Sequence, residues 1–531
     1  MALTSDRRRR IEKYLDALKQ RLITRVAPVE MEMATTYELL SPEEASGLSF
    51  GPCPVGTQWG GQWQYGWFRG SAVLPKSVEG KRVEFLFRSG EAIVYVNRRL
   101  AGGINRGHAT VLLSEQARAG ERYDILVEAY AGHGPTPTSA GPVRDRESLI
   151  PQVPDAQQVF QEASIVVFDE EAYQLYMDLL TLYDSIGSMD ENSLRRHKIE
   201  KSLLDATFII DLEGDSESYA ESVRKAREFL RPILAATNGS TAPEMFCIGH
   251  AHIDVAWLWP LAQTIRKAGA TFATALGLMK EYPEYRFLQS QPQLYAYVKE
   301  YYPEVFQEIK KAVASGQWIV DGGLWVECDT NLVGGESLIR QFLYGKRFMR
   351  EEFGVDSKVM WLPDVFGYSA ALPQIMKGCG VEYFSTHKIF WNYNGGTVFP
   401  YDTFIWEGID GTTVLAHNHR NYNAETKPSS IIWRWNKAIR KEETDVLLYP
   451  FGWGDGGGGP TRDHLEFLRR LKDFEGVPRT RQSSLEEFFE EVERRGAPKS
   501  RYVGELYFEA HRGVYTSQAR TKLLNRKSEF A

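Results

Sequence analysis

Cysteine is scarce in this sequence of 531 residues, which contains four, and no two of them form a Cys-x-x-Cys pair. They are Cys53, Cys247, Cys328 and Cys379. This usage excludes a disulfide framework and a thiolate zinc site, and it is typical of a reducing compartment. No apolar run approaches the roughly 20 residues that span a bilayer, and no apolar secretory core follows the basic N-terminal residues. We therefore expect a cytoplasmic protein with no membrane partner.

An excess of positive charge is also missing. The formal net charge is -7 at pH 7 and the sequence pI is about 5.9, so the chain has no electrostatic footprint for nucleic acid. We expect no nucleic-acid partner. A composition of 43% hydrophobic and 25% charged residues indicates a folded protein, and the length predicts two or three domains. Whether copies of the chain assemble into a homo-oligomer stays open.

Residues 1–25 predict an amphipathic helix. One apolar stripe recurs at three- and four-residue spacing along a charged segment, and it comprises Ile11, Tyr14, Leu15, Leu18 and Leu22. We expect this N-terminal helix to dock on the domain that follows it.

Residues 26–150 show a different pattern, in which short β-rich runs are separated by glycines and polar turns. Regularly spaced strands without helices between them predict an antiparallel β-sandwich, an accessory domain. Its interior bulk is expected to come from Trp63, Trp67, Phe85 and Phe87. A sugar-binding role is open to such a domain, but aromatic residues inside strands favour a supporting one.

The rest of the chain predicts a multidomain α/β protein. A linker rich in Pro, Gly and Ser, Pro135 to Pro154, precedes a helical connector over residues 151–240. In residues 241–510 short apolar runs alternate with helical patterns, which predicts a parallel, barrel-like β/α catalytic domain. Residues 511–531 predict the start of a helical bundle. They stop without a helix terminator, so we expect an amino-terminal portion of a longer protein.

Ionisable residues follow several apolar runs of the catalytic domain, and the carboxyl ends of parallel strands converge. His252 and Asp254 follow the run that begins at Cys247. In an extended chain their side chains share one face, so both can point at one ion. Nitrogen and oxygen ligands suit zinc or a similar divalent metal, and nearby Trp257 and Trp259 would lower the local dielectric. We predict that His252 and Asp254 ligate a metal.

Two further carboxylates are candidates. Asp364 lies between apolar neighbours in Trp361-Leu-Pro-Asp-Val-Phe-Gly-Tyr368, where it needs a metal or strong donors as a partner, unless it caps the next helix. Asp455 lies in Gly452-Trp-Gly-Asp-Gly-Gly-Gly-Gly-Pro460, which lacks the Lys-Ser or Lys-Thr of a phosphate-binding loop. A desolvated Asp455 with a raised pKa would suit a general acid. The alternative is an exposed aspartate in a flexible glycine turn.

The remaining strand-end residues carry weaker signals. They are His250, His387, Lys388, His417 and His419, and His464 lies further on. A lone histidine at the end of a strand more often completes a local hydrogen bond than binds a ligand.

Four motifs together resemble glycoside hydrolase family 38, the class II α-mannosidases, and particularly its cytosolic and bacterial branch. In the family's order they are Gly-His-Ala-His-Ile-Asp-Val-Ala-Trp, Trp-Leu-Pro-Asp-Val-Phe-Gly-Tyr, Gly-Asp-Gly-Gly-Gly-Gly-Pro-Thr and Glu-Ala-His-Arg-Gly-Val-Tyr-Thr-Ser-Gln. The resemblance spans about residues 245–531, and the sandwich resembles the branch's accessory domain less distinctly. It implies a retaining exo-glycosidase that acts on α-linked mannose through a zinc site in an irregular β/α barrel.

Carried over by motif, the resemblance implies that His252, Asp254 and Asp364 ligate the zinc. Asp364 would also be the nucleophile that touches the substrate, Trp257 would form a floor under the bound sugar, and Asp455 would be the acid/base. These roles are the ones that a retaining glycosidase needs, and the metal would orient the mannose hydroxyls. The implied partner is an α-mannosyl oligosaccharide.

One departure concerns the metal. The family's fourth ligand is a histidine in a Phe-His-Asp motif, and none occurs before Ala531. Unless His387, His419 or His511 replaces it, we expect weak metal binding and little hydrolysis from these residues alone. Two other functions stay open: another metal hydrolase of the carbohydrate deacetylase kind, with Asp364 as base, and a non-catalytic carbohydrate-binding protein.

Overall fold

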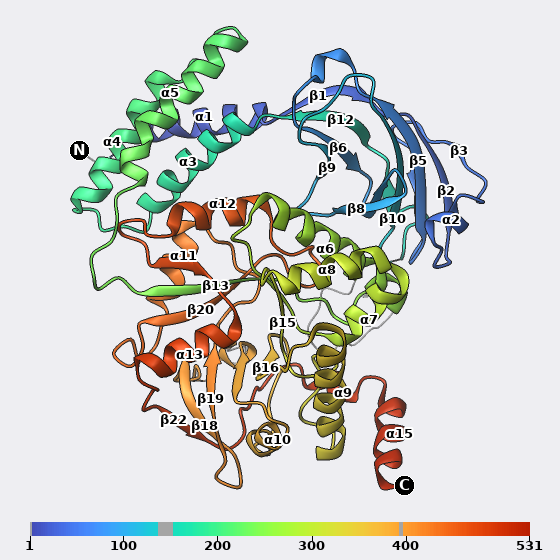
Figure 1. Ribbon diagram of the computed structural model, residues 1–531, viewed down its shortest axis with the longest axis vertical. Helices are drawn as coiled ribbons and strands as arrows, with labels where there is room; N and C mark the ends of the chain where they lie inside the picture. The colour runs from blue at the N-terminus through green and yellow to red at the C-terminus, as the bar shows by residue number, and fades with distance from the viewer. Residues whose placement is uncertain (1–2, 136–151, 392–396) are drawn as a thin grey trace.

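The computed structural model describes residues 3–135, 152–391 and 397–531, so most of the expected linker Pro135–Pro154 lies outside the described residues. Figure 1 shows a β-sandwich and a group of helices above a larger α/β region. The last helix, α15 (Ala519–Phe530), stands beside α9 (Gly335–Phe353) at the lower right. Among the described residues, none of the helices combines the length and the apolar character of a segment that crosses a membrane.

The helical group consists of α1 (Ser5–Arg21), α3 (Glu170–Ile186), α4 (Leu194–Ile209) and α5 (Ser216–Leu234). A Ser, Thr or Asp side chain caps the N-terminus of each helix by accepting a backbone N–H. The apolar stripe of α1 packs on α3 and α4, so our expectation that it docks on the sandwich was wrong. The reason lies in the adjoining strands: Ile23 pairs with Phe168, and the helices on either side therefore leave the sandwich side by side.

Two antiparallel sheets form the sandwich, with strand orders β1-β12-β6-β9 and β3-β2-β5-β10-β7-β8. A short pair, β4 with β11, and helix α2 (Pro42–Ala45) lie beside them. The strands are β1 (Ile23–Pro28), β2 (Met31–Thr36), β3 (Gly51–Pro52), β4 (Gln58–Trp59), β5 (Tyr65–Val73), β6 (Val83–Arg88), β7 (Glu91–Val96), β8 (Arg99–Ile104), β9 (Thr110–Ser114), β10 (Arg122–Tyr130), β11 (Gln158–Val159) and β12 (Glu162–Phe168).

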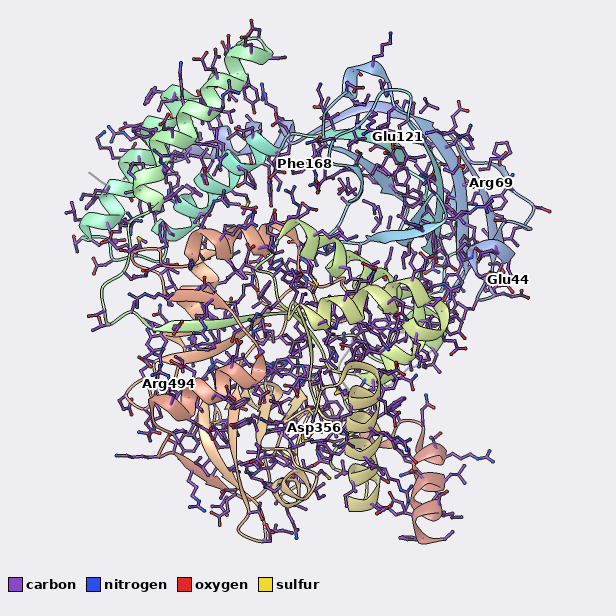
Figure 2. All side chains as sticks on the ribbon, in the orientation of Figure 1. Glu44, Arg69, Glu121, Phe168, Asp356 and Arg494 are labelled. Carbon is purple, nitrogen blue, oxygen red and sulfur yellow. The ribbon has the colours of Figure 1, made fainter. Side chains whose placement is uncertain are left out.

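The sandwich continues into residues that we expected to be helical. Strands β11 and β12 fall within the predicted connector, residues 151–240, and β12 lies between β1 and β6 inside its sheet. The run Ser164 to Phe168 is rich in β-branched residues, and it completes a sheet that began before the linker. Figure 2 labels Phe168 where the sandwich meets the helices.

Strand alternation also corrects the predicted interior. Phe85 and Phe87 are buried between the sheets as expected, together with Phe68. Trp67 is the neighbour of Phe68 and therefore points to the opposite face, where it belongs to a separate cluster of buried residues. Trp63 precedes the strand, has a φ of 66° and lies exposed. The two tryptophans do not fill the space between the sheets.

Two five-stranded sheets form the α/β region. In the first, β15-β14-β13-β20 with β21 beside β13, all pairs are parallel. The second, β16-β17-β19-β18-β22, is parallel except that β18 runs antiparallel to β19. The strands are β13 (Glu244–His250), β14 (Phe287–Gln289), β15 (Trp318–Val320), β16 (Val359–Leu362), β17 (Tyr383–Thr386), β18 (Thr403–Glu407), β19 (Thr413–Asn418), β20 (Val446–Phe451), β21 (Arg479–Gln482) and β22 (Arg501–Val503).

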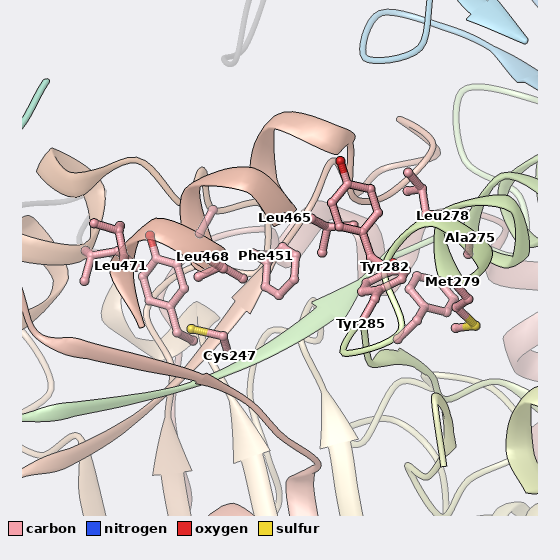
Figure 3. Packing of buried hydrophobic residues seen from close by; sticks show 14 of the residues in the cluster. Cys247, Ala275, Leu278, Met279, Tyr282, Tyr285, Phe451, Leu465, Leu468 and Leu471 are labelled. Carbon is pink, nitrogen blue, oxygen red and sulfur yellow. The ribbon is translucent and has the colours of Figure 1, made fainter. Parts of the chain in front are cut away.

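The expected α/β class is confirmed, with a mixed second sheet as the departure from an all-parallel barrel. A parallel bridge between Gly322 and Met360 links the two sheets. The other helices of this region are α6 (Leu261–Glu281), α7 (Pro292–Tyr301), α8 (Pro303–Ala314), α10 (Leu372–Gly378), α11 (Pro428–Asn436), α12 (Arg462–Leu471), α13 (Leu485–Arg495) and α14 (Arg512–Thr516). Figure 3 shows α12 leucines packing around Cys247 and Phe451 of neighbouring strands, with α6 side chains further along the same cluster beside Tyr282 and Tyr285.

A buried ion pair joins the sandwich to α6. Arg266 Nε donates to Glu128 Oε1 of β10 at 2.6 Å, and both side chains are buried. The guanidinium also lies over the Tyr65 ring, 3.7 Å from its centroid. Without its carboxylate partner, Arg266 would keep a buried charge that rests on neutral backbone carbonyl oxygens and the Tyr65 ring.

We expect Glu128→Ala to lower the free energy of unfolding by about 3–5 kcal/mol, the usual loss when one partner of a buried ion pair is removed. The matched control is Glu32→Ala, since Glu32 pairs with Arg69 on the outer rim of the sandwich, where both side chains are half-exposed. That change should cost less than about 1 kcal/mol. Urea denaturation measures the free energy of unfolding of both variants. Equal decreases would contradict the claim that the buried pair stabilises the contact between the sandwich and α6.

Candidate active site

The candidate residues stand on loops that follow the carboxyl ends of five strands. His252 lies two residues after β13, and Asp364 lies two residues after β16. Lys388 follows β17 by two residues, Tyr422 follows β19 by four, and Asp455 follows β20 by four. The parallel order of these strands brings residues that are far apart in the sequence to one region of the fold.

Three of these side chains form a group that could hold a metal ion. His252, Asp364 and Asp455 each offer a ligand atom, and the three atoms lie within 4.8 Å of one another. His252 is only 3% exposed, and its Nε2 has no hydrogen-bond partner. A buried imidazole nitrogen that faces two carboxylates is a donor set that zinc and similar divalent metals prefer. The described residues therefore fit such a metal.

Asp254 lies beside this group. Its Oδ1 is 3.4 Å from His252 Nε2, and its side chain is 27% exposed. The extended backbone that would give both residues a common face ends at His250, where β13 stops. The group of three ligand atoms within 4.8 Å contains Asp455 in place of Asp254, although we expected Asp455 only as the acid/base. Further along the loop, Trp257 is 58% exposed and meets Trp259 edge to face.

One phenol connects the two aspartates of the group. Tyr422 OH lies 3.1 Å from Asp364 Oδ1 and 2.8 Å from Asp455 Oδ1. A phenol has a single proton to donate, so it can serve only one carboxylate at a time. Lys388 Nζ, 2.8 Å from Asp364 Oδ1, supplies a positive charge to the same cluster. Two carboxylates this close repel each other when both are ionised, so a proton or a cation between Asp364 and Asp455 is favoured.

Electrostatics around Asp364 favour its ionised form. Burial by itself raises the pKa of Asp364, but His387, His252 and Lys388 together hold the pKa below its ordinary value. For Tyr422, burial and the two neighbouring aspartates raise the pKa, so the phenol keeps its proton at neutral pH. Asp364 is therefore ready to act as a nucleophile or as an anionic ligand.

Glu327 supports His252 from the side opposite the aspartates. Its Oε2 lies 2.8 Å from His252 Nδ1, and its Oε1 accepts a hydrogen bond from Ser290 Oγ at 2.7 Å. Such a carboxylate orients the imidazole and leaves Nε2 for a metal. Burial lowers the pKa of His252, but Glu327 and Asp254 raise the pKa well above its ordinary value, so the imidazolium form is favoured and a metal would have to displace the Nε2 proton.

Most of the other strand-end histidines have local partners. The partners are Trp361 for His250, Thr403 for His417, Ser385 for His419 and Thr461 for His464. Of the three histidines considered as replacement ligands, His387 reaches the group, with Nε2 3.9 Å from Asp364 Oδ1. His511 Nε2 lies 3.4 Å from Lys388 Nζ instead.

Sequence reasoning missed Glu327 and Tyr422. Glu327 follows β15 by seven residues, beyond the positions that the strand-end pattern covered. Tyr422 follows β19 by four residues, as Asp455 follows β20, but the pattern selected His, Asp and Lys and passed over tyrosine. A signal was present for Glu327, since it lies in a run of non-helical residues between β15 and α9 and follows two glycines. For Tyr422 the sequence offers no comparable signal.

Comparisons with known proteins match two parts of the chain. A family model described as the N-terminal domain of glycosyl hydrolases family 38 matches residues 242–509. Another, described as an α-mannosidase jelly roll domain, matches residues 26–161. This second match also extends past the predicted end of the sandwich.

Individual relatives match nearly the whole chain. Alpha-mannosidase G of Dictyostelium discoideum is 36% identical over 519 residues, which cover 94% of this chain and 46% of the relative. Alpha-mannosidase 2C1 of Mus musculus is 34% identical over 535 residues, covering 98% of this chain and 50% of the relative. A solved α-mannosidase from Enterococcus faecalis V583 matches with 20% identity and a TM-score of 0.44, over 50% of this chain and 31% of that one. The chain spans about half the length of the curated relatives it matches.

Proposed function

Since this chain belongs to glycosyl hydrolase family 38, we propose that it carries the active site of a metal-dependent, retaining α-mannosidase. The substrate is a terminal α-mannosyl residue of an oligosaccharide. The observation that carries the proposal is the pair Asp364 and Asp455, whose ligand atoms lie within 4.8 Å of each other beside His252. Retaining glycosidases place their two carboxyl groups about 5–5.5 Å apart and inverting enzymes about 6.5–9.5 Å apart. The names of the relatives support mannose as the sugar.

In the proposed reaction Asp364 is the nucleophile. Its carboxylate forms a bond to the anomeric carbon while the glycosidic C–O bond breaks, and Asp455 donates a proton to the leaving oxygen. Asp455 then takes a proton from water, the water oxygen bonds to the anomeric carbon, and the bond to Asp364 breaks. Lys388 helps to keep Asp364 ionised between turnovers, and Tyr422 orients it.

The metal proposed for this site is zinc. His252, Asp254 and Asp364 would hold it, which leaves Asp455 as the acid/base. His252 Nε2, which makes no hydrogen bond and faces both Asp254 and Asp364, supports this assignment. When bound, the ion would supply a positive charge that grips sugar hydroxyls and orients the ring. Trp257 is exposed enough to serve as an aromatic floor for the same ring, since apolar sugar faces pack on aromatic side chains.

We also propose a cytoplasmic location. All four cysteines are free, with Cys53 and Cys247 buried. Free thiols are the normal state in a reducing compartment and are uncommon in secreted proteins.

The full-length protein is expected to hydrolyse an aryl α-mannoside and to release mannose first as the α-anomer. Proton NMR during the first minutes, before the anomers equilibrate, reads this stereochemistry, and an aryl β-mannoside serves as the inert control. A β-anomer as the first product would contradict the retaining mechanism. Release of acetate from an acetylated sugar, without mannoside cleavage, would favour a deacetylase instead.

A further inference from the structure

Asp455 stands at the tip of a closed loop between β20 and α12. Trp453 and Gly459 exchange two backbone hydrogen bonds, of 3.0 Å and 2.8 Å, and so close the loop at its base. The backbone at Asp455 is left-handed, with a φ of 52°, which costs energy in any residue except glycine. Four consecutive glycines follow it. A loop with so few side chains depends on its neighbours for a fixed position.

One neighbour is a turn of the β-sandwich, residues 105–108 between β8 and β9. His108 Nε2 lies 2.9 Å from the carbonyl oxygen of Pro460, which is close enough for the imidazole to donate a hydrogen bond. The Asn105 amide fills the space beside Gly458, since a Cβ on that glycine would lie 2.2 Å from Asn105 Nδ2. Side chains of the sandwich turn therefore touch the backbone of the Asp455 loop.

A second link runs through α6. Lys267 Nζ donates to the carbonyl oxygen of Gly456 at 3.3 Å and contacts both carboxylate oxygens of Glu91 at 2.6 Å. Lys267 is buried, and Glu91 belongs to β7 of the sandwich. A sandwich carboxylate therefore orients the ammonium that holds the residue directly after Asp455.

We infer that the β-sandwich is a structural part of the active site, in which Glu91, acting through Lys267, and His108 are positioning residues that hold Asp455 opposite Asp364. This inference rests on the proposed acid/base role of Asp455. The loop also bonds to the catalytic domain, through Gly456 N to His252 O at 3.0 Å, Gly454 N to Asn423 Oδ1 at 2.8 Å, and Tyr422 OH to the Asp455 carboxylate at 2.8 Å. Those bonds hold the backbone N–H groups at 454 and 456 and the Asp455 carboxylate, whereas the carbonyl oxygens at 456 and 460 are held by groups that the sandwich supplies or orients.

The leaving group of the substrate tests this inference. A poor leaving group such as phenol needs a proton from the acid/base, whereas 2,4-dinitrophenol leaves without one. In the full-length protein, His108→Ala and Glu91→Gln are expected to lower kcat on phenyl α-mannoside by about 10–100-fold, the cost of a misplaced catalytic group. On dinitrophenyl α-mannoside the rate of the glycosylation step should stay within about threefold of the parent rate.

His108→Gln keeps an N–H donor near Pro460 and is expected to restore most of the phenyl α-mannoside activity. Arg69→Gln, on the outer rim of the sandwich, is the matched control and should leave both substrates unaffected. Uniform losses on both substrates in His108→Ala and Glu91→Gln would overturn the positioning role. If His108→Ala does not fold, as its thermal unfolding would show, the conservative Glu91→Gln variant decides the matter.

Asp455→Asn separates this inference from the proposed function. If Asp455→Asn loses activity equally on both substrates, the acid/base assignment fails, and the positioning inference fails with it. If Asp455→Asn affects the phenyl substrate selectively while Glu91→Gln and His108→Ala leave both substrates unchanged, only the positioning inference is overturned. Selective losses in all three variants support both.

Discussion

Replacement of Asp364 by asparagine is expected to lower kcat for α-mannoside hydrolysis by about 10⁴-fold or more, because it removes the nucleophile of a covalent mechanism. An amide has nearly the shape of the carboxylate and still accepts hydrogen bonds from Tyr422 and Lys388, so the local packing should survive. The change removes the negative charge that the surrounding residues stabilise. Steady-state kinetics with an aryl α-mannoside measure the loss.

Asp410→Asn is the matched control for this variant, since Asp410 is an exposed carboxylate on the turn between β18 and β19. It should leave kcat unchanged. A fluorinated mannosyl fluoride, which slows hydrolysis of a glycosyl-enzyme, is expected to add one sugar to the parent protein and none to Asp364→Asn. Peptide mapping should place the sugar on Asp364. A label elsewhere, or none on an active enzyme, would argue against the nucleophile assignment and for Asp364 as a base.

Removal of the metal is expected to have the second largest effect. Dialysis against a chelator should lower kcat/KM by about 10²-fold or more, and added Zn²⁺ should restore it, because the ion would grip and orient the sugar hydroxyls. His252→Ala is expected to abolish stoichiometric metal binding. Glu327→Gln, which changes only the orienting carboxylate, should weaken metal affinity by about 10–100-fold. The metal content of each variant, measured by mass spectrometry at a series of fixed free-zinc concentrations, checks this order of metal affinities.

His197→Ala is a suitable control for the histidine variant, because His197 is a half-exposed residue of α4 far along the chain from the candidate site. It should keep both metal and activity. Turnover that survives complete metal removal would contradict a metal-dependent enzyme. The expectation that these 531 residues alone bind metal weakly stays a prediction, with His387 as the residue to replace if they bind it well.

Much of the catalytic fold follows from local sequence because its strands are buried on both faces. Such strands read as short apolar runs, and the alternation of these runs with helical patterns over residues 241–510 predicted the parallel order that β13, β14 and β15 show. Where strands alternate, prediction was weaker. The sheet face to which a tryptophan points could be predicted only by knowing where β5 begins. Trp67 lies in this strand, whereas Trp63 precedes it.

The sequence predicted the positions of candidate residues that lie directly after a strand better than the positions of those further along a loop. His252 and Asp364 lie within two residues of a strand end, where the direction of the chain still follows the sheet. Asp455 and Tyr422 lie further out, and their places depend on loop backbone that no periodicity encodes. The same limit hid β12, because its partners β1 and β6 are set by contacts across more than 70 residues of sequence.

Arg266 and Lys267 are consecutive residues of α6, so their side chains leave the helix about 100° apart, and yet both reach carboxylates of the sandwich. Rotation of one domain against the other would have to break both ion pairs together. The two pairs therefore oppose hinge bending between the sandwich and α6, and an oligosaccharide of the proposed kind would have to enter and leave the site without that motion.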